Sequence, residues 1–308
     1  MAKRSSKVNY STRSRRPVSR VKPNVSARNI ENLNAQMEGA LFADLVGGIK
    51  KFKNTVTKKQ LDQAFNSGDY SKLKETIPWG DMRKHMKGAE DTIASVVTGT
   101  QKHTLLGVKA AEREEYRQDA NNPRLKQYFK DRQKLLRHNI TDGARAELQE
   151  TIRNATRNGR NSAMVAEEIH NSIGVNRRQA KALKAAQRKL EADGTSKTDI
   201  KRIMAEKTEA FITARAKVIA ITETRIASAT AQLESWRAMQ EDDVIPGNAR
   251  KVWVLGWEHP CAELCEPMDG KAVEINKTWT LPNGKKVMTP NESHPQCRCY
   301  QSLQTDDD

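Results

Sequence analysis

The sequence predicts a mainly α protein, in which an elongated helical body follows a disordered basic arm and precedes a small β-rich module. Three observations support this division of the 308 residues. Residues 1–30 are basic without one acidic side chain, residues 31–250 are rich in strong helix formers, and all four cysteines fall in residues 251–308. We expect three parts with these boundaries, and a further boundary within the body near residue 120.

The chain is strongly basic, with 54 Lys and Arg against 38 Asp and Glu, which gives a net charge of +16. The body contributes +10 of this charge, whereas the C-terminal part holds six basic and nine acidic residues. Such a charge distribution is typical of proteins that neutralise phosphates without reading a base sequence. No stretch approaches the roughly 20 consecutive apolar residues of a transmembrane helix, so we expect neither a membrane-spanning segment nor a membrane partner.

The N-terminal arm combines its basic side chains with Ser, Asn and Pro, and it has too few apolar residues to order itself. It also lacks the apolar core of a signal peptide, so we expect the chain to be made in a cytoplasm. We predict that the arm contacts DNA, although acidic protein surfaces are an alternative partner. The predicted DNA-binding residues are Lys3, Arg4, Lys7, Arg13, Arg15, Arg16, Arg20, Lys22 and Arg28.

The body contains few prolines, and its apolar residues recur with a helical period. We predict helices near residues 31–53, 81–118, 123–138, 141–158, 162–172, 176–193 and 205–241. Typical helix ends are Asn158-Gly159 and Ile173-Gly174, and typical N-caps are Thr141, Ser162 and Asn176. The Arg- and Lys-rich helices near 124–137 and 177–189 are secondary candidates for DNA contact.

The longest predicted helix, 205–241, has one continuous apolar face, as a helix packed along another helix requires. That face comprises Ile212, Ile219, Ile226 and Leu233, seven residues apart, with Ala216, Ala229 and Trp236 in adjacent turns. Glu223 lies beside this face, where an unpaired carboxylate is costly. We favour an ion pair to a basic residue of the body over a contact to another chain or a catalytic acid. His103, His138 and His170 have no nucleophile near them in the sequence and are expected to be packing or surface residues.

The composition changes after Pro246-Gly247-Asn248. Residues 252–257 are typical of a strand, and Gly270, Pro282-Asn283-Gly284 and Pro290-Asn291 supply turns between short apolar runs. The sequence therefore predicts a separate β-rich module in residues 251–308.

This module carries soft metal ligands in two groups about 30 residues apart. The ligand candidates are Cys261, Cys265, His294, Cys297 and Cys299, with His259 just before the first pair. Two close pairs of such ligands are typical of a structural zinc site, and a small module gains much of its stability from one. We predict Zn²⁺ held by Cys261, Cys265, Cys297 and either Cys299 or His294. Reduced thiols in the core and disulfides are the alternatives.

Catalysis by this module is the less favoured hypothesis. A catalytic zinc needs an open coordination position and a nearby acid or base, for which the nearest carboxylates are Glu258, Glu263, Glu266 and Glu292. None of the common zinc-hydrolase or zinc-deaminase motifs is present. We therefore assign no catalytic residue and no organic cofactor, and we predict that the protein is not an enzyme.

The C-terminal motifs resemble those of the phage head morphogenesis family, the minor head proteins typified by protein F of phage Mu. The resemblance rests mainly on Trp257 to Gly270 and on His294-Pro295-Gln296-Cys297-Arg298-Cys299. Two further similar stretches are 158–180 and Ala220-Ile221-Thr222-Glu223-Thr224-Arg225, so the resemblance covers roughly 125–302. It departs from the family pattern at one point, because three residues rather than two separate Cys261 from Cys265.

This resemblance implies a minor capsid protein of a tailed phage, present in the procapsid and virion, inside the capsid, and in the host cytoplasm during assembly. The implied partners are the portal protein and packaged double-stranded DNA, and further the scaffold or major capsid protein. The implied work is head morphogenesis or DNA ejection. Two other hypotheses stay open, a zinc-dependent enzyme that cleaves nucleic acid and an effector delivered from the capsid.

Overall fold

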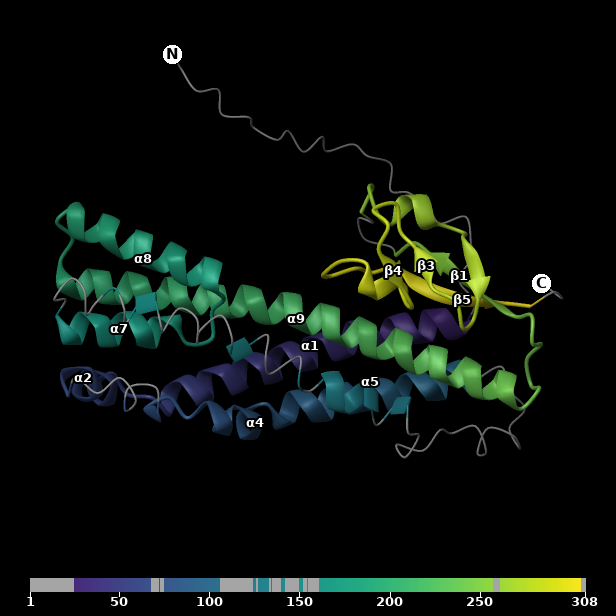
Figure 1. Ribbon diagram of the computed structural model, residues 1–308, viewed down its shortest axis with the longest axis horizontal. Helices are drawn as coiled ribbons and strands as arrows, with labels where there is room; N and C mark the ends of the chain where they lie inside the picture. The colour runs from purple at the N-terminus through teal and green to yellow at the C-terminus, as the bar shows by residue number, and fades with distance from the viewer. Residues whose placement is uncertain are drawn as a thin grey trace, which may run out of the picture.

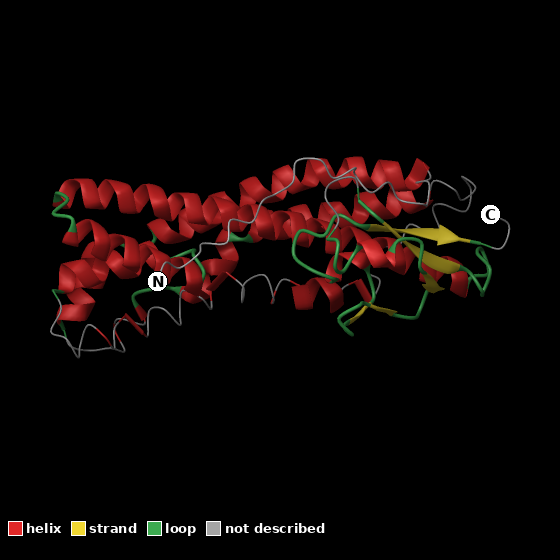
Figure 2. Cartoon of the chain, turned by 90° about the horizontal axis from the view of Figure 1, so that it is seen from above, coloured by secondary structure: helices red, strands yellow, loops and turns green. Residues whose placement is uncertain are grey.

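The structure is a computed structural model that describes residues 25–67, 75–105, 161–256 and 261–305, together with Lys72 and part of 124–154. Its helical part is long and narrow, and the β-rich part lies against one end of it (Figure 1, Figure 2). The prediction of a mainly α protein with a small β-rich C-terminal part is confirmed. No described helix is both long and apolar enough to span a bilayer.

The body is built on α1 (Val25–Asn54), α5 (Lys87–Thr104) and α9 (Lys197–Glu241). α1 packs on both α5 and α9, and α5 packs on α9. The 45 residues of α9 correspond to about 68 Å at 1.5 Å per residue. α9 therefore runs the length of the body and connects its far end to the β-rich part (Figure 1).

Shorter helices complete the far end of the body. These are α2 (Lys58–Asn66), α7 (Ser162–Ser172) and α8 (Arg177–Ala192). α2 packs on α7, and both α7 and α8 pack on α9. A 3₁₀ turn, η1 (Trp79–Asp81), and the single-turn α4 (Met82–His85) lead into α5. The far end is therefore made of helices alone in the described residues.

The first helix begins earlier than predicted. α1 starts at Val25, so Arg28, which the sequence assigned to the flexible arm, is an exposed residue of a helix. The physical reason is that the first turns have buried contacts, through Ala27 and Ile30. Ser26 Oγ also donates to the carbonyl of His103 at 2.8 Å, which ties this turn to the end of α5.

Side-chain caps explain where the other helices begin. Asn176 caps α8 in a capping box with Gln179, as predicted. α7 is capped by Asn161, not by the predicted Ser162, because the Asn161 side chain accepts from the Met164 amide at 3.3 Å. α9 begins at Lys197, eight residues before the predicted 205, because Ser196 accepts from the Asp199 amide.

Other sequence predictions fall on the central part of the chain. Thr141, predicted as an N-cap, is itself helical, as is the preceding Ile140. The predicted helices 81–118, 123–138 and 141–158 are described only in part. His138 and Asn158-Gly159 lie outside the described residues.

The apolar face predicted for α9 is confirmed. Ile212, Ile226 and Leu233 are buried and Ile219 is half-buried, while the core of the body adds residues from α1 such as Leu41 and Leu45.

The turn between α7 and α8 packs closely on α1. Gly174 has φ of +88°, and a Cβ there would lie 2.5 Å from Cγ2 of Ile49. Only glycine satisfies both conditions, as the predicted helix end at this residue requires.

The β-rich part centres on β1 (Arg250–Val254), which pairs antiparallel with β2 (Ala272–Glu274) and β5 (Tyr300–Gln304). A second hairpin joins β3 (Trp279–Thr280) to β4 (Lys286–Val287), and Gly284 has φ of +81° in its turn. Trp253 and Trp279 meet edge to face in the core, with ring centroids 5.5 Å apart. The strand predicted at 252–257 begins earlier, at Arg250, and ends at Val254, and the predicted turns at Gly270 and Pro282-Asn283-Gly284 are in place.

The β-rich part is packed directly on the body. Leu233, Trp236 and Met239 of α9 share an apolar cluster with Ile245 and Ile275. In addition, Gln301 Nε2 donates to the carbonyl of Ala229 at 2.8 Å. β5 also contacts α1, so the start of the first helix and the last strand lie at the same end of the molecule.

Candidate metal centre

Two short loops of the β-rich part bring the cysteines together. In the first, the carbonyl of Cys261 accepts from the amides of Cys265 and Glu266 at 2.8 and 3.1 Å, before the 3₁₀ turn η3 (Glu266–Met268). The second loop runs from the 3₁₀ turn η4 (Pro290–Glu292) to the start of β5. These loops carry all the ligand candidates that the structure describes.

The donor atoms of Cys265, His294 and Cys297 form one group, in which all lie within 4.8 Å of one another. Cys265 Sγ is 3.9 Å from Cys297 Sγ and 3.1 Å from His294 Nε2. Tetrahedral coordination with bonds of about 2.3 Å separates two sulfurs by about 3.8 Å, whereas a disulfide needs about 2.05 Å. All four cysteines are free thiols. The distances therefore suit a shared metal ion rather than a disulfide.

Cys299 belongs to the same group of thiols. It is buried, and hydrogen bonding to Cys265 and Cys297 raises its pKa. The same contact lowers the pKa of Cys297, because the neighbouring thiols of Cys265 and Cys299 stabilise its thiolate. These opposite shifts show that the three thiols lie close enough to interact, and a metal ion would bind them as thiolates. Cys265, Cys297, Cys299 and His294 could together hold a metal ion.

His294 is oriented for this role by its own backbone. Its Nδ1 lies 2.9 Å from the carbonyl of Pro295, and the proton that this bond requires leaves Nε2 free to face Cys265. The hydrogen bond to Cys265 raises the pKa of His294. The imidazole is thus held with its lone pair toward the thiols.

The remaining ligand candidates stand apart. Cys261 is half-buried and packs on the core of the β-rich part, but its thiol is not among the donor atoms that lie within 4.8 Å of one another in the described residues. His259 and Glu258 lie outside the described residues. Of the two alternatives left open by the sequence, His294 belongs to the group whose donor atoms lie within 4.8 Å of one another, whereas Cys299 is linked to it by hydrogen bonds to Cys265 and Cys297.

Backbone contacts hold the second loop in place. Asn291 is buried, and its Nδ2 donates to the carbonyls of both Cys297 and Cys299 at 2.9 and 2.8 Å. Gly256 packs so closely on this segment that a Cβ would lie 2.2 Å from the carbonyl oxygen of Arg298. Both contacts fix the Cys-Arg-Cys backbone before any ligand is bound.

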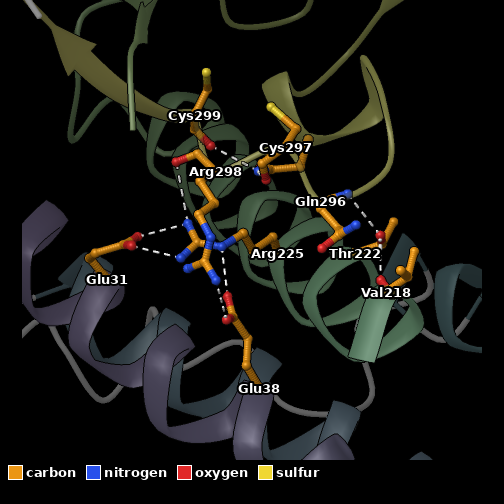
Figure 3. Close-up of polar contacts among 10 residues, drawn as sticks. Glu31, Glu38, Val218, Thr222, Arg225, Gln296, Cys297, Arg298 and Cys299 are labelled. Atoms are coloured by element: carbon orange, nitrogen blue, oxygen red, sulfur yellow. Dashed lines mark hydrogen bonds and ion pairs between the residues drawn. The ribbon is translucent and has the colours of Figure 1, made fainter. Parts of the chain in front are cut away.

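The side chains of the Cys-Arg-Cys segment lie on two opposite sides of the chain. Alternate residues of an extended chain point to opposite sides, so Cys297 and Cys299 share one side and Arg298 takes the other. Figure 3 shows the two thiols turned away from the body and the guanidinium of Arg298 turned toward it. The motif therefore joins the thiol cluster to the helices below.

Arg225 of α9 lies at this junction, with its side chain only 1% exposed. It donates to both carboxylate oxygens of Glu31 at 2.6 and 2.9 Å, to Glu38 at 2.7 Å and to the carbonyl of Arg298 at 3.3 Å (Figure 3). Arg298 in turn donates to Glu38 at 3.2 Å. We call these four residues the arginine junction. It ties α1 and α9 to the second cysteine loop.

The arginine junction was not predicted from the sequence. Its signal was nevertheless present, because Glu31 and Glu38 lie seven residues apart on one face of a helix and Arg225 precedes Ile226 of the apolar face. A charged residue beside a buried stripe requires a partner. The sequence could not show which carboxylates would supply it.

Glu223, two residues earlier, does have the partner that was predicted. Arg132 donates to both of its carboxylate oxygens, at 2.5 and 3.0 Å. Burial raises the pKa of Glu223, and the charge of Arg132 opposes this effect. The structural interpretation of Glu223 is thus confirmed. His103 and His170 are half-buried, and burial lowers the pKa of each.

The carboxylates considered for catalysis have other surroundings. Glu292 Oε2 accepts from the amides of Met288 and Thr289 at 2.8 and 3.4 Å, as part of a capping box at η4. Glu263 and Glu266 are exposed. Of the carboxylates considered for catalysis that the structure describes, Glu292 caps a backbone turn, and Glu263 and Glu266 face solvent.

Lys251 is a second buried cation of the β-rich part. Its Nζ donates to the carbonyl of Met288 at 2.7 Å and lies 4.6 Å from the ring centroid of Trp279. Burial, followed by the charge of Arg237, lowers its pKa to about 7, while Glu292 opposes the shift. Removing this amine from water is costly, and the carbonyl and the ring offset that cost only in part.

The predicted DNA-binding residues of the arm lie outside the described residues, with the exception of Arg28. The comparisons with known proteins add no relative, since no protein-family model, no curated protein and no solved structure matches the chain.

Proposed function

We propose that this chain is a minor head protein of a tailed phage, which contacts the portal vertex and packaged DNA and acts in head morphogenesis or DNA ejection. One observation carries the proposal. Two of the stretches behind the family resemblance, 220–225 and 294–299, contact one another, because Arg225 donates to the carbonyl of Arg298, 73 residues away in the chain. A contact that ties the long helix to the cysteine loop supports an architectural role.

The proposed metal is a structural Zn²⁺. Cys265, Cys297 and Cys299 are buried and His294 is half-buried, and four protein donors leave no coordination position for water or substrate. The role of Glu292 as a backbone cap agrees with a structural site. When bound, the ion would link the two loops and fix the orientation of Arg298.

The proposed DNA contact is non-specific and is made chiefly by the basic arm. Eight of its nine basic residues precede Val25, so α1 can be left whole when the arm is removed. The acidic C-terminal segment is better suited to protein partners, for which the portal and the scaffold or major capsid protein are proposed. The place of action is the procapsid and the capsid interior, after assembly in the host cytoplasm.

A gel-retardation series tests this proposal. Full-length protein and a variant lacking residues 2–23 are mixed with linear duplex DNA over a range of salt concentrations, with zinc and magnesium present. We expect intact, retarded DNA whose binding falls steeply with salt and weakens without the arm. DNA that is cleaved by both proteins, but not by a Glu263→Gln variant, would show the zinc-dependent enzyme instead.

Virion composition provides a second test. Particles purified from a lysate should contain the chain in few copies, detectable by mass spectrometry after nuclease treatment. Absence from intact particles that contain the portal protein would contradict a head protein, whatever the DNA binding.

A further inference from the structure

α8 carries an unusual arrangement of charge. At 100° per residue, its six basic side chains fall within an arc of about 140°. They are Arg177, Arg178, Lys181, Lys184, Arg188 and Lys189. The only other residues in this arc are Ala185 and Ala192, whereas the buried Ala180 and Leu183 lie outside it.

Four of these cations are exposed and form no ion pair with the residues that the structure describes. Lys184 is paired with Glu168 at 3.1 Å, and Arg177 with Glu150 at 3.2 Å. Within the part of the chain that the structure describes, no ion pair holds the others. They are the exposed residues Arg178, Lys181, Arg188 and Lys189, which we call the α8 basic face.

The charge of the whole body is polarised in the same direction. Residues 50–66 and 161–217, which build the far end, contain seventeen basic and eight acidic side chains. Residues 218–256 and 261–305, at the other end, contain nine basic and ten acidic side chains. Figure 1 shows α8 at the end of the molecule opposite the β-rich part. Among these segments, the excess of positive charge therefore lies at the α8 end.

The chemistry of the α8 basic face favours nucleic acid over protein. A protein interface is usually centred on aromatic or large apolar side chains, and the arc contains only alanines between its cations. Alanine also leaves room for a close approach of the helix. Spaced cations on a flat face are sufficient for the sugar-phosphate backbone, which presents regular negative charge.

We propose that the α8 basic face binds the phosphate backbone of duplex DNA without sequence preference, independently of the N-terminal arm. This inference rests on the proposed function for the presence of DNA beside the protein. It adds a second contact at the end of the body far from the residue where the arm joins α1.

The test uses the protein lacking residues 2–23, so that the arm makes no contribution. The face variant carries Arg178→Gln, Lys181→Gln, Arg188→Gln and Lys189→Gln, since glutamine retains helix propensity. The matched control carries Arg83→Gln, Lys84→Gln, Lys87→Gln and Lys102→Gln, four exposed residues of α4 and α5. Circular dichroism verifies that both are folded. Binding to a 20-base-pair duplex is followed by fluorescence anisotropy against salt.

We expect the face variant to lower the slope of log K against log salt by about 3 to 4, because each lost phosphate contact removes about 0.9. The control should change this slope by less than about 1. Equal losses in both variants, or no loss in the face variant, would overturn the proposal. If the arm-deleted face variant keeps the salt slope of the arm-deleted parent while the full-length protein binds DNA, the proposed function stands and this inference fails.

A competitor identifies the partner class. Poly-L-glutamate is titrated against the same complexes at the same salt. If it binds the arm-deleted protein as tightly as the duplex does, and only the face variant loses it, the surface recognises acidic protein and the proposal for DNA is overturned.

Discussion

Arg225 shows how one residue can hold two parts of a protein together. Its guanidinium donates hydrogen bonds to two carboxylates of α1 and to one carbonyl of the cysteine loop. A guanidinium suits this position because it is planar and always charged, whereas an ammonium is a single point charge. The burial of this charge is tolerated only because every partner is in place.

Replacing Arg225 by Met should therefore be costly. The change keeps the volume but leaves Glu31 and Glu38 facing a buried apolar side chain, and we expect a loss of about 3 kcal/mol in the free energy of unfolding. Urea denaturation measures it. Arg202→Met is the control, because its ion pairs to Asp199 and Glu206 are exposed and worth less than about 1 kcal/mol. Equal losses in the two variants would show that the arginine junction is unimportant.

The burial of Lys251 predicts how the stability of the protein depends on pH. Its pKa is lowered to about 7 in the folded protein from 10.5, so the unfolded chain binds the proton more tightly. Stability should then rise with pH from about 7 to 10.5, since unfolding takes up a proton in this range. A Lys251→Met variant should lose this part of the slope in chemical denaturation at a series of pH values. Parallel curves for both proteins would contradict the prediction.

At the scale of elements, the central feature is a small β-rich unit with little apolar core of its own. Its interior contains Trp253 and Trp279 together with three buried cysteines. A unit of this size gains stability from a metal ion that links its loops. The helices of the body, by contrast, share a long apolar core that does not involve the cysteines.

Removing the metal should unfold the β-rich unit while the helices of the body stay folded. With a chelator, we expect the fluorescence of the buried tryptophans to shift to the red while the helical circular dichroism is largely kept. Elemental analysis should give one zinc per chain before treatment. Cys297→Ser should lose the metal and Cys261→Ser should retain it. The reverse result for Cys261→Ser and retention by Cys299→Ser would make Cys261 the fourth ligand.

Local signals in the sequence account for most of the elements. The seven-residue repeat predicts α9, the Asn176 cap predicts the start of α8, and the turn at Pro282-Asn283-Gly284 predicts the β3–β4 hairpin. These features depend on neighbours in the chain. The arm boundary was misplaced because Ala27 and Ile30 are held by contacts that are distant in sequence.

The sequence predicted which residue types could form the candidate metal centre, but not which of these residues lie together. Cysteine spacing gave five candidates, and the choice among them depends on how the two loops approach. Thiols two residues apart share one side of an extended chain, which indicates that Cys297 and Cys299 act together. The arginine junction could not be predicted, because its partners are separated by up to 260 residues.

At the scale of the whole molecule, the chain is an elongated body with two different ends. One end holds the start of α1, the last strand and the thiol cluster, and the other holds α8 and an excess of positive charge (Figure 1). Antiparallel packing of α1 along α9 produces this separation, since Glu31 meets Arg225 while Lys50 meets Glu209.

The length of α9 sets a spacing that can be compared with a nucleic-acid helix. Gln179 of α8 bonds to the carbonyl of Phe211, which places the middle of α8 some twenty residues of α9 from Arg225. Measured along the helix and on to Val25, the middle of α8 lies about 40 Å from the start of α1. One turn of duplex DNA is about 34 Å. The start of α1 and the middle of α8 are therefore separated by somewhat more than one turn of a duplex.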